Sequence, residues 1–360
     1  MLFEQLLAGP TRRSENLKFL KNTDCAVIVF GIAQAAKWTT AMLQKNGIKV
    51  DAYCVSDNFW KPDLKFGNIP VSSCSEIFKK YDKAVVILAV GSNRKKLREE
   101  ILSHKQVSAC LEFDCPTVSE TYDRDQMLPY RDALETLYSK LEDDFSRQTM
   151  TVFLNERISG DLDSLSSVDQ PEKDQYFPEF VSYSREECVV DCGAFIGDTL
   201  EMFLKNAGDV KRYFAFECDP ENFGKLHSKF GGKDNIVLLP YGVSDSDRTA
   251  YVDFDGGSDS RISDSGKNAI KLTTIDRVIA EHQRGCTLIK MDVEGAELAA
   301  LHGAEQTIRK YRPKLAICVY HKAEDLWTIP QYILSLHSDY KLYLRKYASP
   351  FSCELVLYAI

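Results

Sequence analysis

The stretch VVDCGAFIGDT at residues 189–199 decides the fold of the chain. An apolar strand ends in Asp191, and two glycines four residues apart, Gly193 and Gly197, lead into a helix that we expect to begin near Thr199. Glycine lets a backbone turn tightly and approach a ligand closely, where a Cβ would collide. The stretch predicts a strand, a ligand-binding loop and a helix of an α/β sheet, although a purely structural turn would show the same pattern.

This loop differs from the dinucleotide-binding GxGxxG sequence, because an acid stands where the first glycine belongs. A pyrophosphate would be poorly held there. S-adenosylmethionine (SAM) has no phosphate, and an acid at this position can receive its ammonium group directly or through water. We therefore predict a SAM site, and the loop residues expected to bind the cofactor are Asp191, Gly193, Ala194, Gly197, Asp198 and Thr199.

A second carboxylate, Glu217, ends the next expected strand, 26 residues after Asp191. A carboxylate at this strand tip can accept both ribose hydroxyls, which NAD and SAM share. Glu217 alone would also suit an ordinary exposed strand end, but together with the loop it favours a ligand site. Asp219, which with Pro220 begins the next helix, and Asp292 after a later strand are further predicted cofactor-binding residues. Topology alone places Tyr241 and Gly242 beside the adenine.

Strands and helices alternate through the C-terminal half, which is typical of a parallel, doubly wound sheet. A late pair of strands resembles the antiparallel hairpin that often closes a methyltransferase sheet. We assign residues 181–360 to this domain, and the strands expected in it are 189–191, 213–217, 236–239, 287–292, 315–319, 340–345 and 354–359.

The N-terminal part predicts a second, smaller Rossmann-like domain at residues 1–115. Leu2, Phe3, Leu6 and Leu7 suit one face of a short helix at its start. Residues 116–180 show helical spacing, and we expect them to form a helical connector. Its role could be that of a lid or of a plain interdomain spacer. The strands expected in the first domain are 26–30, 48–55, 84–90 and 109–113, with helices at 34–46 and 99–104.

The turn of this first domain reads GIAQAA at residues 31–36, so alanine replaces two of the three fingerprint glycines. The alanine nearest a pyrophosphate makes tight NAD binding unexpected, although Asp57 after the second strand could still meet a ribose. The domain resembles the small Rossmann-like modules in front of some sugar-modifying transferases. We interpret it as a degenerate nucleotide-binding or substrate-docking domain, with a purely structural role as the alternative.

The run TLIKMDVEGAE at residues 287–297 carries the candidate chemistry. Strand alternation places Lys290 and Asp292 on one face, and a lysine in an apolar strand is costly unless it is paired. A Lys290–Asp292 pair that stabilises the sheet and a substrate-site role both remain open. The predicted catalytic residues are Asp292, Glu294 at the carboxyl end of the strand, and His321 after the next strand, where an imidazole could serve as a base.

Several of these segments together resemble the FkbM-type SAM-dependent methyltransferases. The resemblance covers about residues 176–360, and KMDVEGAE at 290–297 is its most specific part. It implies a seven-stranded class I methyltransferase fold and O-methylation of a small molecule or glycan. The strand after Arg312-Pro313 reads AICVYH where many members have an acid, so His321 becomes a candidate replacement for the base. The other matching segments are DCGAFIGDT at 191–199, FECDP at 216–220 and LTTID at 272–276.

Composition limits the partners. The formal charge of −8 argues against a nucleic-acid substrate. Residues 1–115 hold 17 Lys and Arg against 12 Asp and Glu, whereas the remainder holds 28 against 41; a mixed solvated surface explains the N-terminal surplus better than an anionic ligand. The 11 cysteines show no CxxC pair and no metal-ligand spacing, which indicates a reducing, cytoplasmic protein without a metal. No apolar run reaches the ~18 residues of a membrane span, and no signal peptide is expected.

The sequence thus predicts a SAM-dependent methyltransferase that modifies a hydroxyl of a sugar, a glycan or a related metabolite. Two alternatives remain open: an NAD-dependent nucleotide-sugar enzyme that uses the first domain, and a non-catalytic SAM-binding protein. The expected partner is a small-molecule or glycan acceptor. The oligomeric state, homo-oligomers included, stays open.

Overall fold

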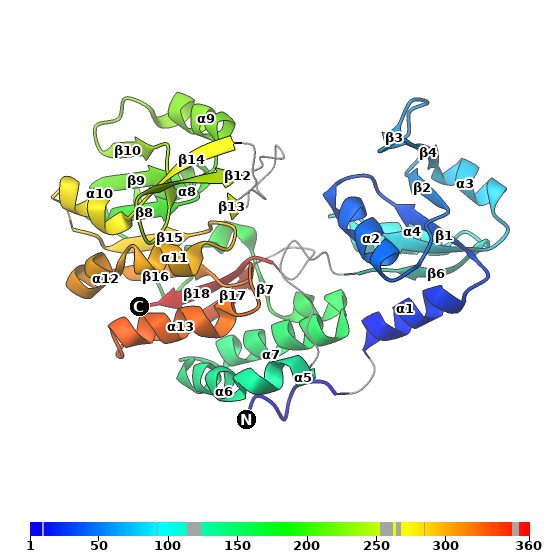
Figure 1. The fold of residues 1–360 in the computed structure, drawn as a ribbon, viewed down its shortest axis with the longest axis horizontal. Helices are drawn as coiled ribbons and strands as arrows, with labels where there is room; N and C mark the ends of the chain where they lie inside the picture. The colour runs from blue at the N-terminus through cyan, green and yellow to red at the C-terminus, as the bar shows by residue number, and fades with distance from the viewer. Residues whose placement is uncertain are drawn as a thin grey trace.

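The computed structural model describes residues 1–8, 11–91, 93–113, 124–252, 262–263, 268–283, 285–347 and 353–360. Figure 1 shows two α/β bodies, each built around a twisted sheet, with the helices α5 to α7 beside the larger one. The first body follows the predicted N-terminal domain, and the second holds the predicted methyltransferase sheet. Among the described helices, none combines the length and the hydropathy that a bilayer span requires.

The first body has a six-stranded sheet in the order β3-β4-β2-β1-β5-β6, parallel except for β3 against β4. Buried aliphatic side chains on both faces of β1 and β5 explain why these strands lie at its centre. Its strands are β1 Ala26–Phe30, β2 Ala52–Val55, β3 Lys65–Phe66, β4 Ile69–Ser73, β5 Ala84–Leu88 and β6 Val107–Leu111, and its helices are α1 Arg12–Asn22, α2 Gln34–Lys45, α3 Cys74–Lys80 and α4 Arg94–Leu102.

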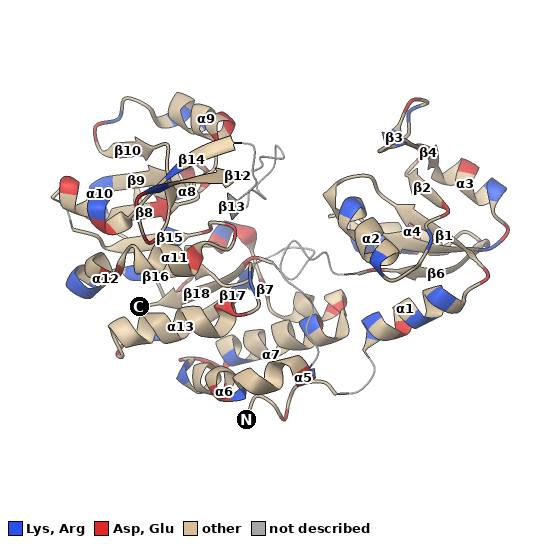
Figure 2. Cartoon of the chain, viewed as in Figure 1, with Lys and Arg blue, Asp and Glu red and all other residues tan. Residues whose placement is uncertain are grey.

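The surface of this body carries charges of both signs, and Lys or Arg side chains lie beside acidic ones along α1 and α3 (Figure 2). Asp57, which the sequence placed near a ribose, accepts hydrogen bonds from the backbone N–H and the hydroxyl of Ser75 in the first turn of α3. Its carboxylate therefore caps a helix in this structure.

The first eight residues depart from the predicted domain boundary. They form a turn and not the expected short helix, and Leu2, Phe3 and Leu6 are buried in the core of the second body. The backbone N–H groups of Leu2 and Phe3 donate to the carboxylate of Glu135 at 2.8 and 3.0 Å. Hydrophobic spacing predicted burial for these side chains, but it could not reveal that they pack against a partner more than a hundred residues away.

The helical segment after residue 123 also packs into the second body. Leu134, Leu137, Met150, Phe153 and Leu154 share one core with the strands of the large sheet. The segment consists of α5 Arg124–Met127, the 3-10 turn Leu128–Tyr130, α6 Arg131–Lys140 and α7 Asp144–Ser159, followed by the 3-10 turns Leu162–Ser167 and Glu172–Asp174 around β7 Asp169–Gln170.

The second body has an eight-stranded sheet in the order β10-β9-β8-β15-β16-β18-β17-β7. β18 runs antiparallel to β16 and to β17, and the other pairs are parallel. This order confirms the predicted class I sheet and its terminal hairpin, and β7 from the connector adds an eighth strand to the seven that were expected. Its strands are β8 Cys188–Cys192, β9 Arg212–Phe216, β10 Ile236–Leu239, β15 Leu288–Met291, β16 Lys314–Cys318, β17 Leu342–Tyr347 and β18 Leu355–Ala359; its helices are α8 Asp198–Ala207, α9 Pro220–Phe230, α10 Ile275–Glu281, α11 Glu297–His302, α12 Glu305–Tyr311 and α13 Asp325–Leu336.

A small second sheet lies between β10 and β15 in the chain and was not predicted. Its order is β11-β14-β12-β13. Alternate residues of β12 and β14 are buried, so this sheet presents one apolar face and one exposed face. Its strands are β11 Gly242–Val243, β12 Arg248–Val252, β13 Ile262–Ser263 and β14 Asn268–Thr273.

Candidate functional site

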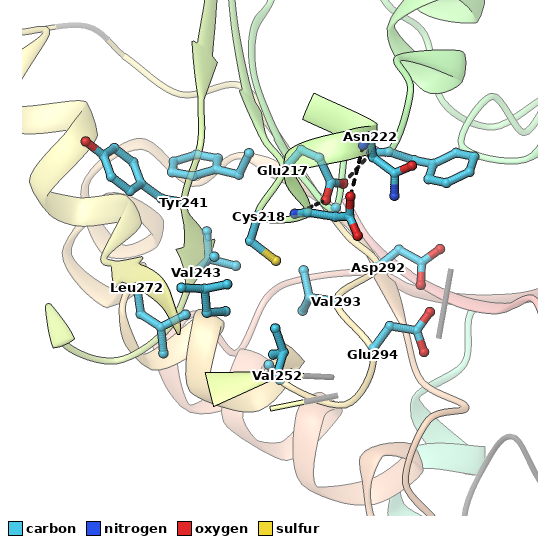
Figure 3. A pocket seen from close by; sticks show the side chains of 17 residues that line it. Glu217, Cys218, Asn222, Tyr241, Val243, Val252, Leu272, Asp292, Val293 and Glu294 are labelled. Atoms are coloured by element: carbon cyan, nitrogen blue, oxygen red, sulfur yellow. Dashed lines mark hydrogen bonds between the residues drawn. The ribbon is translucent and has the colours of Figure 1, made fainter. Parts of the chain in front are cut away.

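A cavity opens at the carboxyl ends of β8, β9 and β15, where ligands bind in open α/β sheets. Its empty volume is about 810 Å³, a figure that includes space open to solvent. Figure 3 shows polar side chains at one end and apolar ones at the other. The predicted residues that line it are Gly193, Glu217, Asp219, Tyr241, Gly242, Asp292 and Glu294.

Gly193 lets the loop after β8 meet the loop after β15. Its φ is +79°, and a Cβ at this position would lie 1.9 Å from the carbonyl oxygen of Asp292. Only glycine satisfies both the left-handed backbone and this close approach. Gly197, at the start of α8, similarly allows a close contact with α9. A Cβ there would lie 2.5 Å from a ring carbon of Phe230.

Asp191 lies under the cavity and does not line it. Its carboxylate is fully buried, accepts a hydrogen bond from the hydroxyl of Tyr213 at 2.8 Å and lies 3.0 Å from Nζ of Lys290. The strand alternation had suggested Asp292 as the partner of Lys290. The structure shows that the partner is Asp191. Paired parallel strands hold Asp191 and Lys290 side by side, about 4.8 Å apart, whereas residues two apart on one strand are about 7 Å apart.

Lys290 also stabilises the glycine loop. Its ammonium donates to the carbonyl oxygens of Cys192 at 3.3 Å and Gly193 at 2.7 Å. Burial lowers the pKa of Lys290, but the carboxylates of Asp191 and Asp292 together outweigh burial and raise the pKa above its usual value, so the amine stays charged. The buried pair fixes the shape of the loop from below, because both groups have hydrogen-bond partners that compensate their lost hydration.

Glu217 follows β9 and faces the cavity. Oε2 accepts the backbone N–H of Phe195 at 2.8 Å, and Oε1 accepts that of Asp219 at 2.7 Å. These two bonds fix the carboxylate in one orientation and leave further lone pairs on both oxygens for a ligand. Burial raises the pKa of Glu217 to about 7, although both backbone hydrogen bonds oppose that shift.

The other predicted loop residues have structural contacts. Asp219 caps α9, because its carboxylate accepts the backbone N–H groups of Glu221 and Asn222 at 2.7 and 3.0 Å. Ala194 is buried and donates its N–H to the carbonyl of Phe216 at 2.9 Å. Asp198 and Thr199 begin α8 outside the cavity lining.

The apolar end of the cavity comes largely from residues that the sequence reasoning missed. The small sheet contributes Val243, Val252, Ile270 and Leu272 beside the predicted Tyr241 and Gly242. Ile270 and Leu272 alternate with exposed residues along β14, and this period of two was the available signal. The side chains of Val243 and Leu272 lie together in Figure 3, away from the carboxylates of Asp292 and Glu294.

The three predicted catalytic residues lie together at the polar end. Nε2 of His321 is 3.5 Å from Oδ1 of Asp292 and 3.4 Å from Oε2 of Glu294. Nδ1 of the same ring is 2.8 Å from Oε1 of Glu297. Burial lowers the pKa of His321, but the carboxylates of Glu297, Asp292 and Glu294 outweigh burial and raise it to about 10. The ring therefore keeps a proton at neutral pH unless another cation takes its place, which argues against a general base at this residue.

Two buried tyrosines and Glu297 support this cluster and were not identified from the sequence as part of it. The hydroxyls of Tyr176 and Tyr320 donate to the two oxygens of Asp292 at 3.4 and 3.5 Å. Glu297, fully buried, accepts the backbone N–H of Val293 at 2.9 Å as well as contacting His321. Glu297 was not among the predicted catalytic residues, and Tyr176 had no distinguishing signal because it comes from the connector.

Comparison with known proteins agrees with this geometry. A model of the family described as Methyltransferase FkbM domain matches residues 191–349, which confirms the predicted resemblance over that range. No curated protein matches the sequence. The crystal structure of methyltransferase FkbM from Methylobacillus flagellatus KT aligns with 96% of this chain and 93% of its own, at 23% identity and a TM-score of 0.77.

More distant solved structures cover about half of this chain. An rRNA methylase from Streptococcus thermophilus aligns at 14% identity with a TM-score of 0.33, covering 49% of this chain and 86% of its own. Aeropyrum pernix fibrillarin, in complex with natively bound SAM, aligns at 12% identity with a TM-score of 0.32, covering 52% and 72%. The fold of both bodies is thus found in the Methylobacillus structure, and the likeness of the first body to modules of sugar-modifying transferases stays a prediction.

Proposed function

We propose that the domain at residues 191–349, which matches the model of the FkbM methyltransferase family, binds SAM in the cavity and methylates a hydroxyl of an acceptor. The acceptor class that we propose is a sugar, a glycan or a related small metabolite. The observation that carries the proposal is Glu217: a carboxylate fixed by two backbone N–H groups faces the cavity beyond the tip of the second strand of the sheet.

The two ends of the cavity suit the two ends of the cofactor. Glu217 can accept the ribose hydroxyls, as carboxylates at this strand tip do in related α/β sheets. The apolar residues of the small sheet, with Tyr241 and Val243, offer a surface for the adenine ring. The methionine part then extends along the Gly193 loop toward Asp292 and Glu294. This direction places the methyl group near the polar cluster.

SAM supplies an activated methyl group, so this chain mainly has to position the acceptor. The acceptor oxygen attacks the methyl carbon; an O–C bond forms as the C–S bond breaks, which yields a methyl ether and S-adenosylhomocysteine. The hydroxyl proton passes to a carboxylate of Asp292 or Glu294. This assignment differs from the prediction that His321 is the base, because its ring already holds a proton.

Calorimetric titration with SAM and S-adenosylhomocysteine tests the cofactor assignment. We expect micromolar binding with one site per chain. Methyl transfer is then sought by incubating the protein with isotopically labelled SAM and pools of monosaccharides, nucleotide sugars and glycans. Absence of binding by the folded protein would refute the proposal, and binding without transfer to any pool would favour a non-catalytic SAM-binding protein.

The affinity for S-adenosylhomocysteine is expected to fall with acidification. Glu217 has a pKa raised to about 7 by burial, and its protonated form loses part of its capacity to accept ribose hydroxyls. Below pH 7 the affinity should therefore drop, by up to about tenfold per pH unit, whereas above pH 8 it should be constant. Titrations from pH 5.5 to 8.5 measure this dependence.

The Glu217→Gln variant isolates that effect. At pH 8 this variant should bind S-adenosylhomocysteine more weakly than the native chain does. Its affinity should not fall on acidification, because the amide has no carboxylate to protonate. An equal pH dependence in both proteins would show that another group, on the ligand or the protein, causes it.

A further inference from the structure

The polar end of the cavity has the geometry of a metal site. One carboxylate oxygen of Asp292, one of Glu294 and a ring nitrogen of His321 all lie within 4.8 Å of one another. The carboxylates come from the loop after β15, and the imidazole follows β16. Figure 3 shows the side chains of Asp292 and Glu294 extending toward the same side. Both line the proposed cofactor cavity.

The imidazole supplies a second, independent observation. His321 is only 3% exposed, and within the described part of the chain Nε2 has no hydrogen-bond partner. This nitrogen lies 3.5 and 3.4 Å from the nearest oxygens of Asp292 and Glu294, which is longer than a charge-assisted hydrogen bond. Separations of this size suit ligand atoms around one cation. A buried nitrogen without a hydrogen bond is otherwise costly.

The other ring nitrogen faces a carboxylate, as in known metal sites. Nδ1 lies 2.8 Å from the fully buried carboxylate of Glu297. Metal-binding histidines commonly direct their second nitrogen to a carboxylate, which fixes the ring and makes the ligand more basic. Glu297 is itself fixed by the backbone N–H of Val293. This arrangement directs Nε2 toward Asp292 and Glu294.

The charge around the ring also suits a divalent cation. One imidazolium carries a single positive charge against the three carboxylates of Asp292, Glu294 and Glu297. A divalent cation would compensate more of this negative charge than one proton does.

We propose that Asp292, Glu294 and His321 form a binding site for a divalent cation of the Mn²⁺ type. One nitrogen and two carboxylate oxygens suit Mn²⁺ better than Mg²⁺, which favours oxygen ligands. Three protein ligands leave coordination positions open for a substrate. The sequence had predicted no metal. Asp292 and Glu294 are close in the chain, but His321 follows much later, so the three residues form no recognisable ligand spacing.

The role of this cation rests on the proposed methyltransferase function. The open positions would take the acceptor hydroxyl and a neighbouring oxygen, so the site favours acceptors with two adjacent oxygens, such as a sugar diol. The cation lowers the pKa of the bound hydroxyl. Its proton passes to the oxygen of Asp292 or Glu294 that does not coordinate the cation, and the acceptor oxygen then attacks the methyl carbon.

Electron paramagnetic resonance titration of the chelator-treated full chain with MnCl₂ tests the site without any substrate. We expect one bound Mn²⁺ per chain, with at least tenfold weaker binding in Glu294→Gln and His321→Gln. Glu324→Gln is the matched control, because Glu324 is exposed near the same loop but outside the cluster; its Mn²⁺ affinity should equal that of the native chain. Since His321 is buried, the partly exposed Glu294 provides the variant that keeps the test valid if His321→Gln does not fold.

S-adenosylhomocysteine binding is measured on the same samples to separate the two proposals. No Mn²⁺ binding by a protein that binds S-adenosylhomocysteine overturns the metal site and leaves the proposed function standing. Mn²⁺ binding that Glu294→Gln and Glu324→Gln weaken equally also overturns it. Mn²⁺ binding lost only in the cluster variants supports the site, even where no S-adenosylhomocysteine binds and the proposed function fails.

Discussion

Replacing Glu217 with alanine is expected to lower the affinity for SAM and S-adenosylhomocysteine by about 100- to 1,000-fold. Glu217 is the carboxylate that we assign to the two ribose hydroxyls, and each hydrogen bond to a charged group contributes about 1.5–3 kcal/mol. Even at the lower end of that range, loss of both bonds costs about 3 kcal/mol, which corresponds to a change of more than about 100-fold in the dissociation constant. The variant also leaves the N–H groups of Phe195 and Asp219 without their present acceptor, so the loop becomes less ordered.

Isothermal titration calorimetry of the variant measures this loss. Glu221→Ala is the matched control, because Glu221 is an exposed carboxylate in the next helix that pairs with Lys225 at 2.7 Å. We expect its affinity to match that of the native chain within a factor of two. Circular dichroism of all three proteins shows whether the fold is kept. Glu217→Ala binding within threefold of the native value in a folded protein would refute the ribose assignment.

The strands that position Glu217 and Gly193 could be predicted because they are buried and central. A parallel strand covered on both faces appears as a short apolar run, and β8, β9 and β15 lie within one or two residues of the predicted runs. The polar residues that follow such runs necessarily meet at one edge of the sheet. This is why Glu217, Asp292, Glu294 and His321 could be placed together from the sequence.

The contacts between these elements could not be predicted in the same way. The choice of Asp191 over Asp292 as the partner of Lys290 depends on the register of β15 against β8, and one sequence does not fix that register. Tyr176 reaches Asp292 from the connector, 116 residues away. The apolar end of the cavity required the small sheet, whose strands are short and exposed on one face.

The Gly193→Ala variant is expected to lose about 3 kcal/mol of unfolding free energy in the second body. A φ of +79° costs a residue with a Cβ roughly 1–2 kcal/mol. The new methyl group would also lie 1.9 Å from the carbonyl oxygen of Asp292, so the loops after β8 and β15 must separate; overpacking of this kind costs about 1–3 kcal/mol. The same displacement moves Asp292, and cofactor affinity should fall with stability.

Gly224→Ala provides the opposite expectation from the same chemical change. Gly224 lies in the exposed interior of α9, and a Cβ there would contact nothing within 4 Å. Alanine should raise the stability of the second body by about 0.5–1 kcal/mol, because it favours the helix. Scanning calorimetry of the full chain measures both variants through the transition that shifts with bound S-adenosylhomocysteine. If Gly193→Ala were as stable as Gly224→Ala, the loop after β8 would not need the close backbone approach that joins the cofactor cavity to the cluster around His321.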